Sequence, residues 1–239
     1  MTDNKNNSNI ENKLQAIEIT KIFPHPVKKE TNIAIFAGAS FKMSAGNLNF
    51  IIGPSGSGKT TLLRMLMGIE PLSAGEVFLN GQAIHTLKGK EKIDYFKSVG
   101  YMDQFPARYL SLSLSARRNL TYSLRLYRKT GREEEKKQVE EIATTLNLES
   151  LLNQKTLSLS GGELRRLALA CSMIHNPSLL LLDEPTAQLD AENKETILTL
   201  LKKLNETIRS LIIISTHDMT IIEPATTFKI EGRRVSKWK

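Results

Sequence analysis

The strongest constraint on the fold is a glycine-rich segment between an aliphatic run and a helical pattern. Residues 48–52 are strand-like, and the next eight residues, Gly53–Thr60, match the pattern G-x-x-x-x-G-K-[ST]. From Lys59, leucine and methionine recur at helical spacing until Gly68, a residue type that commonly follows the last turn of a helix. A strand, a tight loop and a helix in this order predict an α/β fold.

This loop predicts a nucleoside triphosphate site. Its glycines allow successive backbone N–H groups to turn inward around an anion, and the helix N-terminus adds positive potential. We expect Lys59 to reach the β- and γ-phosphates and the Thr60 hydroxyl to bind Mg²⁺. The predicted phosphate-binding residues are Gly53, Pro54, Ser55, Gly56, Ser57, Gly58, Lys59, Thr60 and Thr61.

A second pattern places two carboxylates at the end of a buried strand. The aliphatic run 179–182 is followed by Asp183 and Glu184. Ligands bind at the carboxyl ends of strands in open α/β sheets, so we expect Asp183 beside Mg²⁺ and Glu184 beside the attacking water as general base. Taken alone, the same residues also fit a simple turn after a strand.

The rest of the chain alternates aliphatic runs with amphipathic helices, which favours a mostly parallel sheet covered on both faces. Further strands are predicted at 14–20, 34–43, 98–102 and 211–215, with a hairpin at 76–84 around Asn80-Gly81 and a β pair near Gly232. Helices are predicted between 114 and 174, one of them with a capping box at Thr130–Glu133, and at 191–208. The helices before 174 form an insertion in the sheet.

The segment Leu159–Glu163 points to a nucleotide shared between two subunits. Ser160, Gly161 and Gly162 open an apolar helix, which is again an anion-binding arrangement, although the chain already has its own P-loop. With this segment the chain resembles the ATP-binding cassette (ABC) ATPases, and the resemblance covers residues 14–239. Residues 160–163 resemble the signature motif of that family, in which glutamine is better known than Glu163.

The other family motifs occur in the expected order. Tyr101–Gln104 resembles the Q-loop, whose glutamine contacts Mg²⁺ and the water, and Ala187–Asp190 resembles the D-loop, which packs against the partner subunit. His217 is similar to the switch histidine that holds the γ-phosphate. Phe23 lies where the family places an aromatic side chain that stacks on adenine.

The resemblance implies an ATPase whose cofactors are ATP and Mg²⁺. The residues assigned on this basis are Lys59, Gln104, Glu184 and His217 for catalysis, Thr60, Gln104 and Asp183 for Mg²⁺, and Phe23, Ser160, Gly161, Gly162, Glu163 and Asp190 for the nucleotide. It also implies a homodimer or a paired ABC subunit closed around two ATP, and a separate integral membrane permease that contacts residues 105–118. The expected location is cytoplasmic, peripheral at the inner face of the cell membrane.

The resemblance also sets the expected domain organisation. We expect residues 1–13 to form a disordered leader and residues 14–239 to form a single ABC ATPase domain, with a helical subdomain at about 105–175. The short hairpin after the P-loop helix looks most like the branch that serves lipoprotein, macrolide and antimicrobial-peptide exporters. Because the permease recognises the transported substrate, the sequence does not identify it.

The charge distribution is compatible with other function classes. The net charge is +8, and residues 88–132 hold 11 Lys/Arg against three acidic residues, which suits a membrane surface, an anionic partner, nucleic acid or a merely solvated face. One alternative is a soluble ABC ATPase that acts on nucleic acid or ribosomes. The single cassette and the short P-loop-to-signature distance argue against it, so no nucleic-acid partner is expected. Another alternative is a cassette that regulates a membrane partner without transport.

Overall fold

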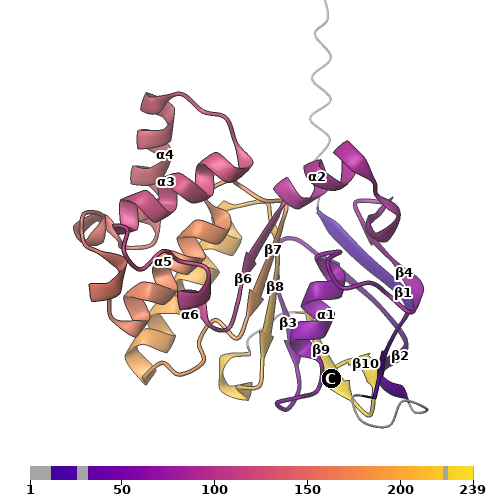
Figure 1. The fold of residues 1–239 in the computed structure, drawn as a ribbon. Helices are drawn as coiled ribbons and strands as arrows, with labels where there is room; N and C mark the ends of the chain where they lie inside the picture. Colours follow the sequence, from indigo (N-terminus) through magenta and orange to yellow (C-terminus); the bar gives the residue numbers. More distant parts are fainter. Residues whose placement is uncertain (1–11, 26–31, 223–225, 239) are drawn as a thin grey trace, which may run out of the picture.

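The computed structural model describes residues 12–25, 32–222 and 226–238. Its centre is a six-stranded sheet with the order β10-β9-β3-β8-β7-β6 (Figure 1). Neighbouring strands from β9 to β6 are parallel, and β10 is antiparallel to β9, which confirms the predicted mostly parallel sheet. The strands are β3 (Leu48–Ile52), β6 (Val99–Met102), β7 (Leu179–Asp183), β8 (Leu211–Thr216), β9 (Thr226–Glu231) and β10 (Arg234–Lys237).

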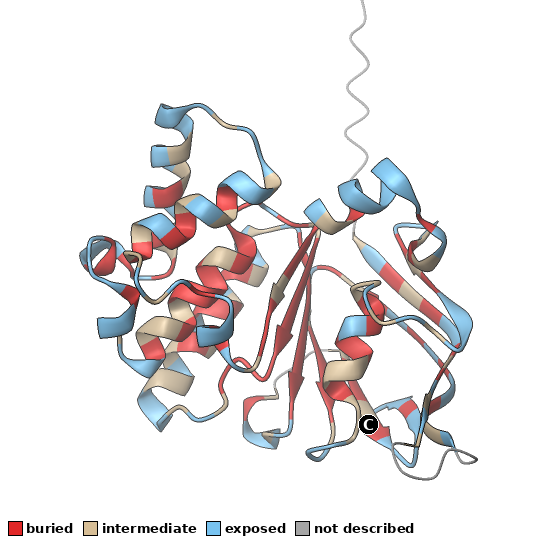
Figure 2. Cartoon of the chain, in the orientation of Figure 1, coloured by how far each residue is buried: buried red, intermediate tan, exposed pale blue. Residues whose placement is uncertain are grey.

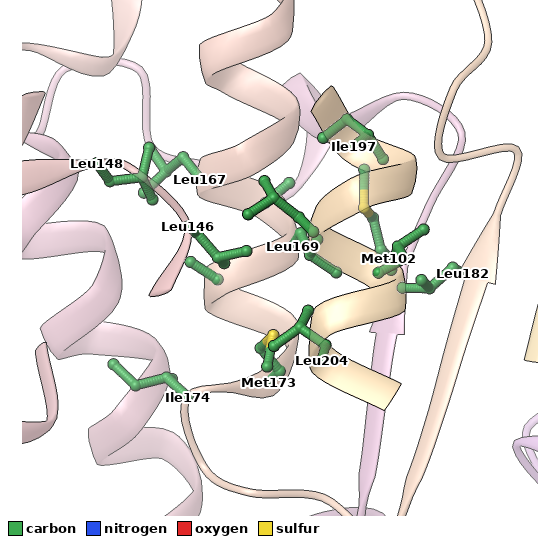
Figure 3. Packing of buried hydrophobic residues seen from close by; sticks show 14 of the residues in the cluster. Met102, Leu146, Leu148, Leu167, Leu169, Met173, Ile174, Leu182, Ile197 and Leu204 are labelled. Atoms are coloured by element: carbon green, nitrogen blue, oxygen red, sulfur yellow. The ribbon is translucent and has the colours of Figure 1, made fainter. Parts of the chain in front are cut away.

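This sheet separates two hydrophobic cores, because side chains alternate between its faces. On β7, Leu180 and Leu182 pack in the core that holds the helices between β6 and β8, part of which Figure 3 shows. Leu179 and Leu181 pack in the other core, with the P-loop helix. Figure 2 shows the central strands buried along their length. Burial on both faces explains why β7 and β8 are continuous aliphatic runs in the sequence.

A second, four-stranded antiparallel sheet has the order β2-β1-β4-β5 and shares the P-loop helix core. Its strands are β1 (Lys13–Pro24), β2 (Asn32–Ser44), β4 (Ala74–Leu79) and β5 (Gln82–Ala83). Between β4 and β5, Asn80 and Gly81 have φ of 52° and 82°, the left-handed values that a type I′ turn requires, so the predicted hairpin turn is confirmed. The leader was predicted to end at residue 13, but Lys13 already pairs with Ser44 in β1.

Six helices are present in the described residues. They are α1 (Lys59–Leu66), α2 (Gly89–Lys97), α3 (Ala116–Tyr127), α4 (Arg132–Thr145), α5 (Gly161–Met173) and α6 (Ala191–Thr207). Short 3-10 helices lie at Ile84–Thr86, Pro106–Arg108, Glu149–Leu151, Thr156–Ser158 and Met219–Ile221. In Figure 1, α3, α4, α5 and α6 lie on the side of the central sheet away from α1.

Two local predictions are corrected. Helix α2 was not predicted, because its sequence is mostly charged and only Tyr95 is buried. The capping box predicted at Thr130–Glu133 does not form: the N-cap of α4 is Gly131, with no side-chain cap hydrogen bond, and the buried Thr130 hydroxyl has no hydrogen-bond partner among the described residues. The helix begins one residue too late for the Thr130 hydroxyl to cap it.

Residues 1–11 of the predicted leader lie outside the described residues. Among the residues that the structure does describe, every helix is too short or too polar to span a bilayer.

Candidate functional site

The P-loop connects β3 to α1 at the carboxyl end of the central sheet (Figure 1). Gly58, the N-cap of α1, has φ 101° and makes no side-chain cap hydrogen bond. A Cβ atom at this position would lie 2.5 Å from Cγ2 of Ile35, so both the backbone angle and the space require glycine. The first turn of α1 therefore presents its N–H groups without a competing side-chain cap, as an anion site requires.

Lys59 brings together the P-loop, the end of β7 and the end of β8. Its Nζ donates to the carbonyl oxygens of Gly53 (2.9 Å) and Pro54 (3.2 Å) and lies 3.1 Å from Oε1 of Glu184. On the other side, Nδ1 of His217 lies 3.0 and 2.9 Å from the two carboxylate oxygens of Glu184. The Glu184 carboxylate is buried between the Lys59 ammonium and the His217 imidazole, two groups that were also predicted to take part in catalysis.

The second carboxylate, Asp183, faces two hydroxyl groups. Thr60 donates to Oδ2 of Asp183 at 2.6 Å, and Ser215 donates a short hydrogen bond to Oδ1. Burial raises the pKa of Asp183, an effect that these two hydrogen bonds oppose. The parallel register places Asp183 directly beside Ser215, a site residue that the sequence analysis missed. Its position at the end of an aliphatic strand was the available signal.

A pocket of about 270 Å³ joins these groups. Nine of its ten lining residues were predicted from the sequence, and Ile35 of β2 is the tenth. The lining consists of Ile35, Ser55, Gly56, Gly58, Lys59, Thr60, Thr61, Gln104, Glu184 and His217. A second pocket, of about 450 Å³, is lined by Pro54 to Ser57, by Ile33 to Ile35 of β2 and by residues 229–233.

Phe23 is placed differently from the P-loop residues. It lies on β1 opposite Ile33, and Nζ of Lys21 sits 4.5 Å from the centroid of its ring. Lys21 is in turn fixed by Glu70, at 2.5 Å. Ile33, the partner of Phe23 on β2, thus lines the second pocket, while the Phe23 ring itself packs against the buried Lys21 ammonium. Its stacking on adenine stays a prediction.

The signature segment lies apart from this pocket within the described chain. Ser160 caps α5: its Oγ accepts from the N–H of Glu163 (3.3 Å), and the Glu163 carboxylate accepts from the N–H of Ser160 (2.8 Å). This is a capping box, formed where the sequence analysis predicted none. Ser160 and Gly161 are exposed.

Gly162 connects the signature segment to the predicted D-loop. A Cβ atom at Gly162 would overlap the side-chain amide of Asn193. Asn193 is held by Asp190, which caps α6 and accepts from the backbone N–H (2.8 Å) and from Nδ2 of Asn193. The backbone N–H of Asn193 lowers the pKa of Asp190. Asp190 therefore belongs with the signature segment rather than with the P-loop pocket.

The residues around Asp183 fit a magnesium ion. Mg²⁺ prefers hard oxygen ligands and is commonly bound by one or two carboxylates together with substrate phosphates. Asp183 and Thr60 provide a carboxylate and a hydroxyl beside the pocket. Among the described residues, His, Cys, Asp and Glu form no cluster that could hold a metal unaided.

A P-loop at the end of one parallel strand, beside two buried carboxylates at the end of another, defines a P-loop nucleoside triphosphatase. The ABC transporter family matches residues 36–187, more than half of the chain. The chain belongs to this family: it is an ABC transporter ATP-binding cassette that binds and hydrolyses ATP.

Relatives from several transport systems share similar identity with this chain. The lipoprotein-releasing system ATP-binding protein LolD of Buchnera aphidicola (subspecies Acyrthosiphon pisum) is 35% identical, over 86% of this chain and 90% of that protein. The sn-glycerol-3-phosphate import ATP-binding protein UgpC of Cereibacter sphaeroides is also 35% identical, over 80% of this chain and 52% of that protein. The match spans nearly all of LolD and about half of UgpC.

Solved ABC cassettes share the fold. The dimeric structure of MJ0796, a bacterial ABC transporter cassette, superposes with a TM-score of 0.82 at 28% identity, covering 93% of this chain and 96% of that one. A dimeric post-hydrolysis state of MJ0796 bound to ADP and Pi gives a TM-score of 0.83 at 28% identity, covering 95% and 98%.

Proposed function

We propose that this chain is the nucleotide-binding subunit of an ABC transporter. In this proposal two copies, or one copy and a paired ABC subunit, close head to tail around two ATP, and closure drives a separate membrane permease. In this proposal the transporter is an exporter or extractor, because the chain matches LolD over 90% of that protein but UgpC over 52% of its length. The subunit is cytoplasmic and bound at the inner face of the membrane, and residues 13–239 act as one domain with a helical lobe at about 105–175.

The observation that carries the dimer is the division of the site. Predicted nucleotide contacts from the P-loop line one pocket. Ser160 and Gly161 of the signature segment are exposed away from that pocket. A helix start with Ser160 and Gly161 exposed has a use in ATP hydrolysis when it meets the P-loop pocket of a second subunit. The MJ0796 cassette with the same fold is dimeric.

Each site residue has a distinct task in the proposed reaction. The P-loop N–H groups and Lys59 hold the phosphates, which they can do because the α1 terminus has no side-chain cap. Glu184 takes a proton from the attacking water as general base, and His217 holds the γ-phosphate while its Nδ1 contacts the Glu184 carboxylate. Gln104, at the pocket edge, positions the water. Mg²⁺, held by Thr60, Asp183 and Gln104, would supply positive charge to the phosphates of ATP while the γ-phosphate is transferred to water and ADP leaves.

The permease is proposed to dock between the helical lobe and the central sheet. A pocket of about 300 Å³ lies there, lined by residues of β6, α3 and α5 and by the segment after Gln104. Tyr109, Tyr122 and Leu126 at this pocket are exposed, and exposed aromatic and aliphatic side chains around a groove favour a protein partner. Arg108 and Arg118 add positive charge nearby.

Glu184→Gln tests the proposal. We expect this variant to be monomeric without nucleotide and dimeric with Mg·ATP, because it binds ATP but hydrolyses it only slowly. Size-exclusion chromatography with light scattering, with and without Mg·ATP, measures this. A Ser160→Arg substitution in the same background should abolish the dimer and leave Mg·ATP binding to the monomer unchanged. A monomer at saturating Mg·ATP in Glu184→Gln itself would contradict the shared nucleotide.

A further inference from the structure

Arg165 is a buried cation that the sequence motifs do not explain. It lies on α5, five residues after Ser160, and its side chain is 5% exposed. Its guanidinium donates three hydrogen bonds, all of them to main-chain carbonyl oxygens: from Nη1 to Glu184 (3.2 Å) and Pro185 (3.4 Å), and from Nη2 to Gln104 (3.4 Å). The acceptors come from two loops far apart in the sequence.

These two loops carry the side chains proposed to act on the attacking water. Glu184 and Gln104 both line the P-loop pocket, and Arg165 holds the backbone of both from behind. The guanidinium is planar with donors in a fixed fork, so it relates its acceptors to one another more rigidly than a single donor would. Movement of α5 relative to the sheet would therefore displace Glu184 and Gln104 together through the Arg165 side chain.

The backbone at Glu184 needs such support. Its φ is 49°, a left-handed value that is unusual for a residue other than glycine. On the sheet side, its N–H donates to the carbonyl oxygen of Ser215 (3.1 Å) and to Oγ of the same residue (3.2 Å). On the other side, Nη1 of Arg165 donates to its carbonyl oxygen. The turn is thus held from β8 and from α5 together.

A neutral side chain could fill a purely structural role without the free-energy cost of burying a charge. Burial lowers the pKa of Arg165, which means that the folded protein carries a desolvated charge here, and the nearby Glu184 charge only partly offsets this. Neutral donors could satisfy the same carbonyl oxygens. The fork of this guanidinium spans the three carbonyl oxygens of Glu184, Pro185 and Gln104, which a single neutral donor would not do.

We propose that Arg165 is a positioning residue for ATP hydrolysis, which sets the Glu184 carboxylate and Gln104 relative to the P-loop and connects both to the signature helix. This inference rests on the proposed role of Glu184 as general base. It adds a connection within one chain: the helix that begins at Ser160 also holds the loop that carries the base.

Steady-state hydrolysis of Mg·ATP by the full chain tests the inference. We expect Arg165→Met to lower kcat about 10- to 100-fold, the loss typical of a misplaced catalytic group, and to change KM less than about twofold. Arg165→Lys retains the charge but lacks the fork, and should give an intermediate kcat. Arg125→Met on α3, where an exposed arginine pairs with Glu135, is the matched control and should leave both constants unchanged.

A double substitution separates positioning from a general structural effect. In the Glu184→Gln background, Arg165→Met should lower the residual kcat by clearly less than it does in the wild type, because there is no base left to position and only the effect through Gln104 remains. Circular dichroism and thermal unfolding check that each variant is folded. If Arg165→Met does not fold, the Arg165→Lys pair decides in the same way.

The outcomes are distinguishable. The inference is overturned if kcat of the folded Arg165 variants equals that of the wild type, if KM rises in step with the loss, or if the Arg165 effect persists in full without Glu184. A Glu184→Gln variant with wild-type hydrolysis would overturn the proposed role of Glu184 and this inference together. An inactive Glu184→Gln beside fully active Arg165 variants would overturn this inference alone.

Discussion

Two helices of this molecule begin with glycine-rich, anion-seeking sequences, and their first turns are built in opposite ways. At α1, Gly58 has φ 101° and provides no side-chain cap, and Lys59, Glu184 and His217 converge on the opening. At α5, Ser160 and Glu163 cap each other, and a Cβ atom on Gly162 would overlap Asn193 of the same chain.

The difference shows that sequence likeness between two helix starts does not give them equal functions. The first turn of α1 is open to a ligand and surrounded by charge, so it can hold phosphates by itself. In α5 the capping box already satisfies two N–H groups. The Ser160 hydroxyl accepts there but keeps its own hydrogen free to donate, and it is exposed. The α5 start is therefore suited to completing a site brought to it by another surface.

The largest loss of activity is expected from a substitution at the P-loop pocket, where α1 begins. Glu184→Gln should lower kcat by about 10²- to 10⁴-fold, the usual contribution of a general base, with Mg·ATP affinity retained. Phosphate release and equilibrium binding of Mg·ATP measure the two quantities. Glu195→Gln, an exposed position on α6, is the control and should be silent. Equal losses in kcat and in affinity would mean that Glu184 holds nucleotide rather than activating water.

The next largest effect is expected at the same pocket, from Ser215, which touches no substrate in our proposal. Ser215→Ala removes a hydroxyl that supports Asp183. Loss of such an outer partner typically costs about 10- to 100-fold in metal affinity, so the Mg²⁺ concentration for half-maximal hydrolysis should rise by that factor. Titration of activity with Mg²⁺ at saturating ATP measures it. An unchanged Mg²⁺ midpoint would remove Asp183 from the proposed metal site.

A smaller effect is expected at the α5 half. Gly162→Ala would push against the amide of Asn193, whereas Gly161→Ala meets no atom within 4 Å. Overpacking of this kind costs about 1–3 kcal/mol, enough to reduce hydrolysis about tenfold if it displaces the signature segment. Binding of Mg·ATP to the monomer should be the same in both variants. Equal activity of the two alanine variants would contradict the proposed contact between the signature and Asn193.

The smallest effect concerns the far end of α5. His175 stacks on Tyr127 of α3 with ring centroids 3.9 Å apart, and its Nε2 lies 3.3 Å from the carbonyl oxygen of Val99. Burial lowers the pKa of His175 to about 4, an effect opposed by the Val99 carbonyl and assisted by Arg128. The neutral imidazole therefore favours folding above pH 6.5, and this contribution is lost as the pH falls toward 4.

Urea unfolding at pH 7 and pH 4.5 measures this contribution. Between these values the wild type should lose about 2 kcal/mol more unfolding free energy than His175→Gln, which cannot titrate. The substitution itself will lower stability at both pH values, so the comparison lies in the difference between them. An equal pH dependence in the two proteins would show that protonation of His175 is not coupled to folding.

Local sequence signals were reliable where one residue type is required by the backbone. The Asn80-Gly81 turn, the glycine at the N-cap of α1 and the buried strand β7 all follow from nearest-neighbour constraints. The capping boxes show the opposite case. The same four-residue pattern was predicted at Thr130 and fails there, but forms at Ser160, because the residue at which a helix begins depends on what the helix packs against.

The sequence by itself determined the two-sided burial of the sheet, the phosphate loop and the identity of nearly all pocket residues, because those properties reside in hydrophobic runs and in short motifs. Only the tertiary structure decided which side chains meet. The register of β7 on β8 brings Ser215 to Asp183, and the packing of α5 delivers Arg165 to the carbonyl oxygens of Glu184 and Gln104. Such contacts join residues far apart in the chain, and nothing in the local sequence of either partner specifies the other.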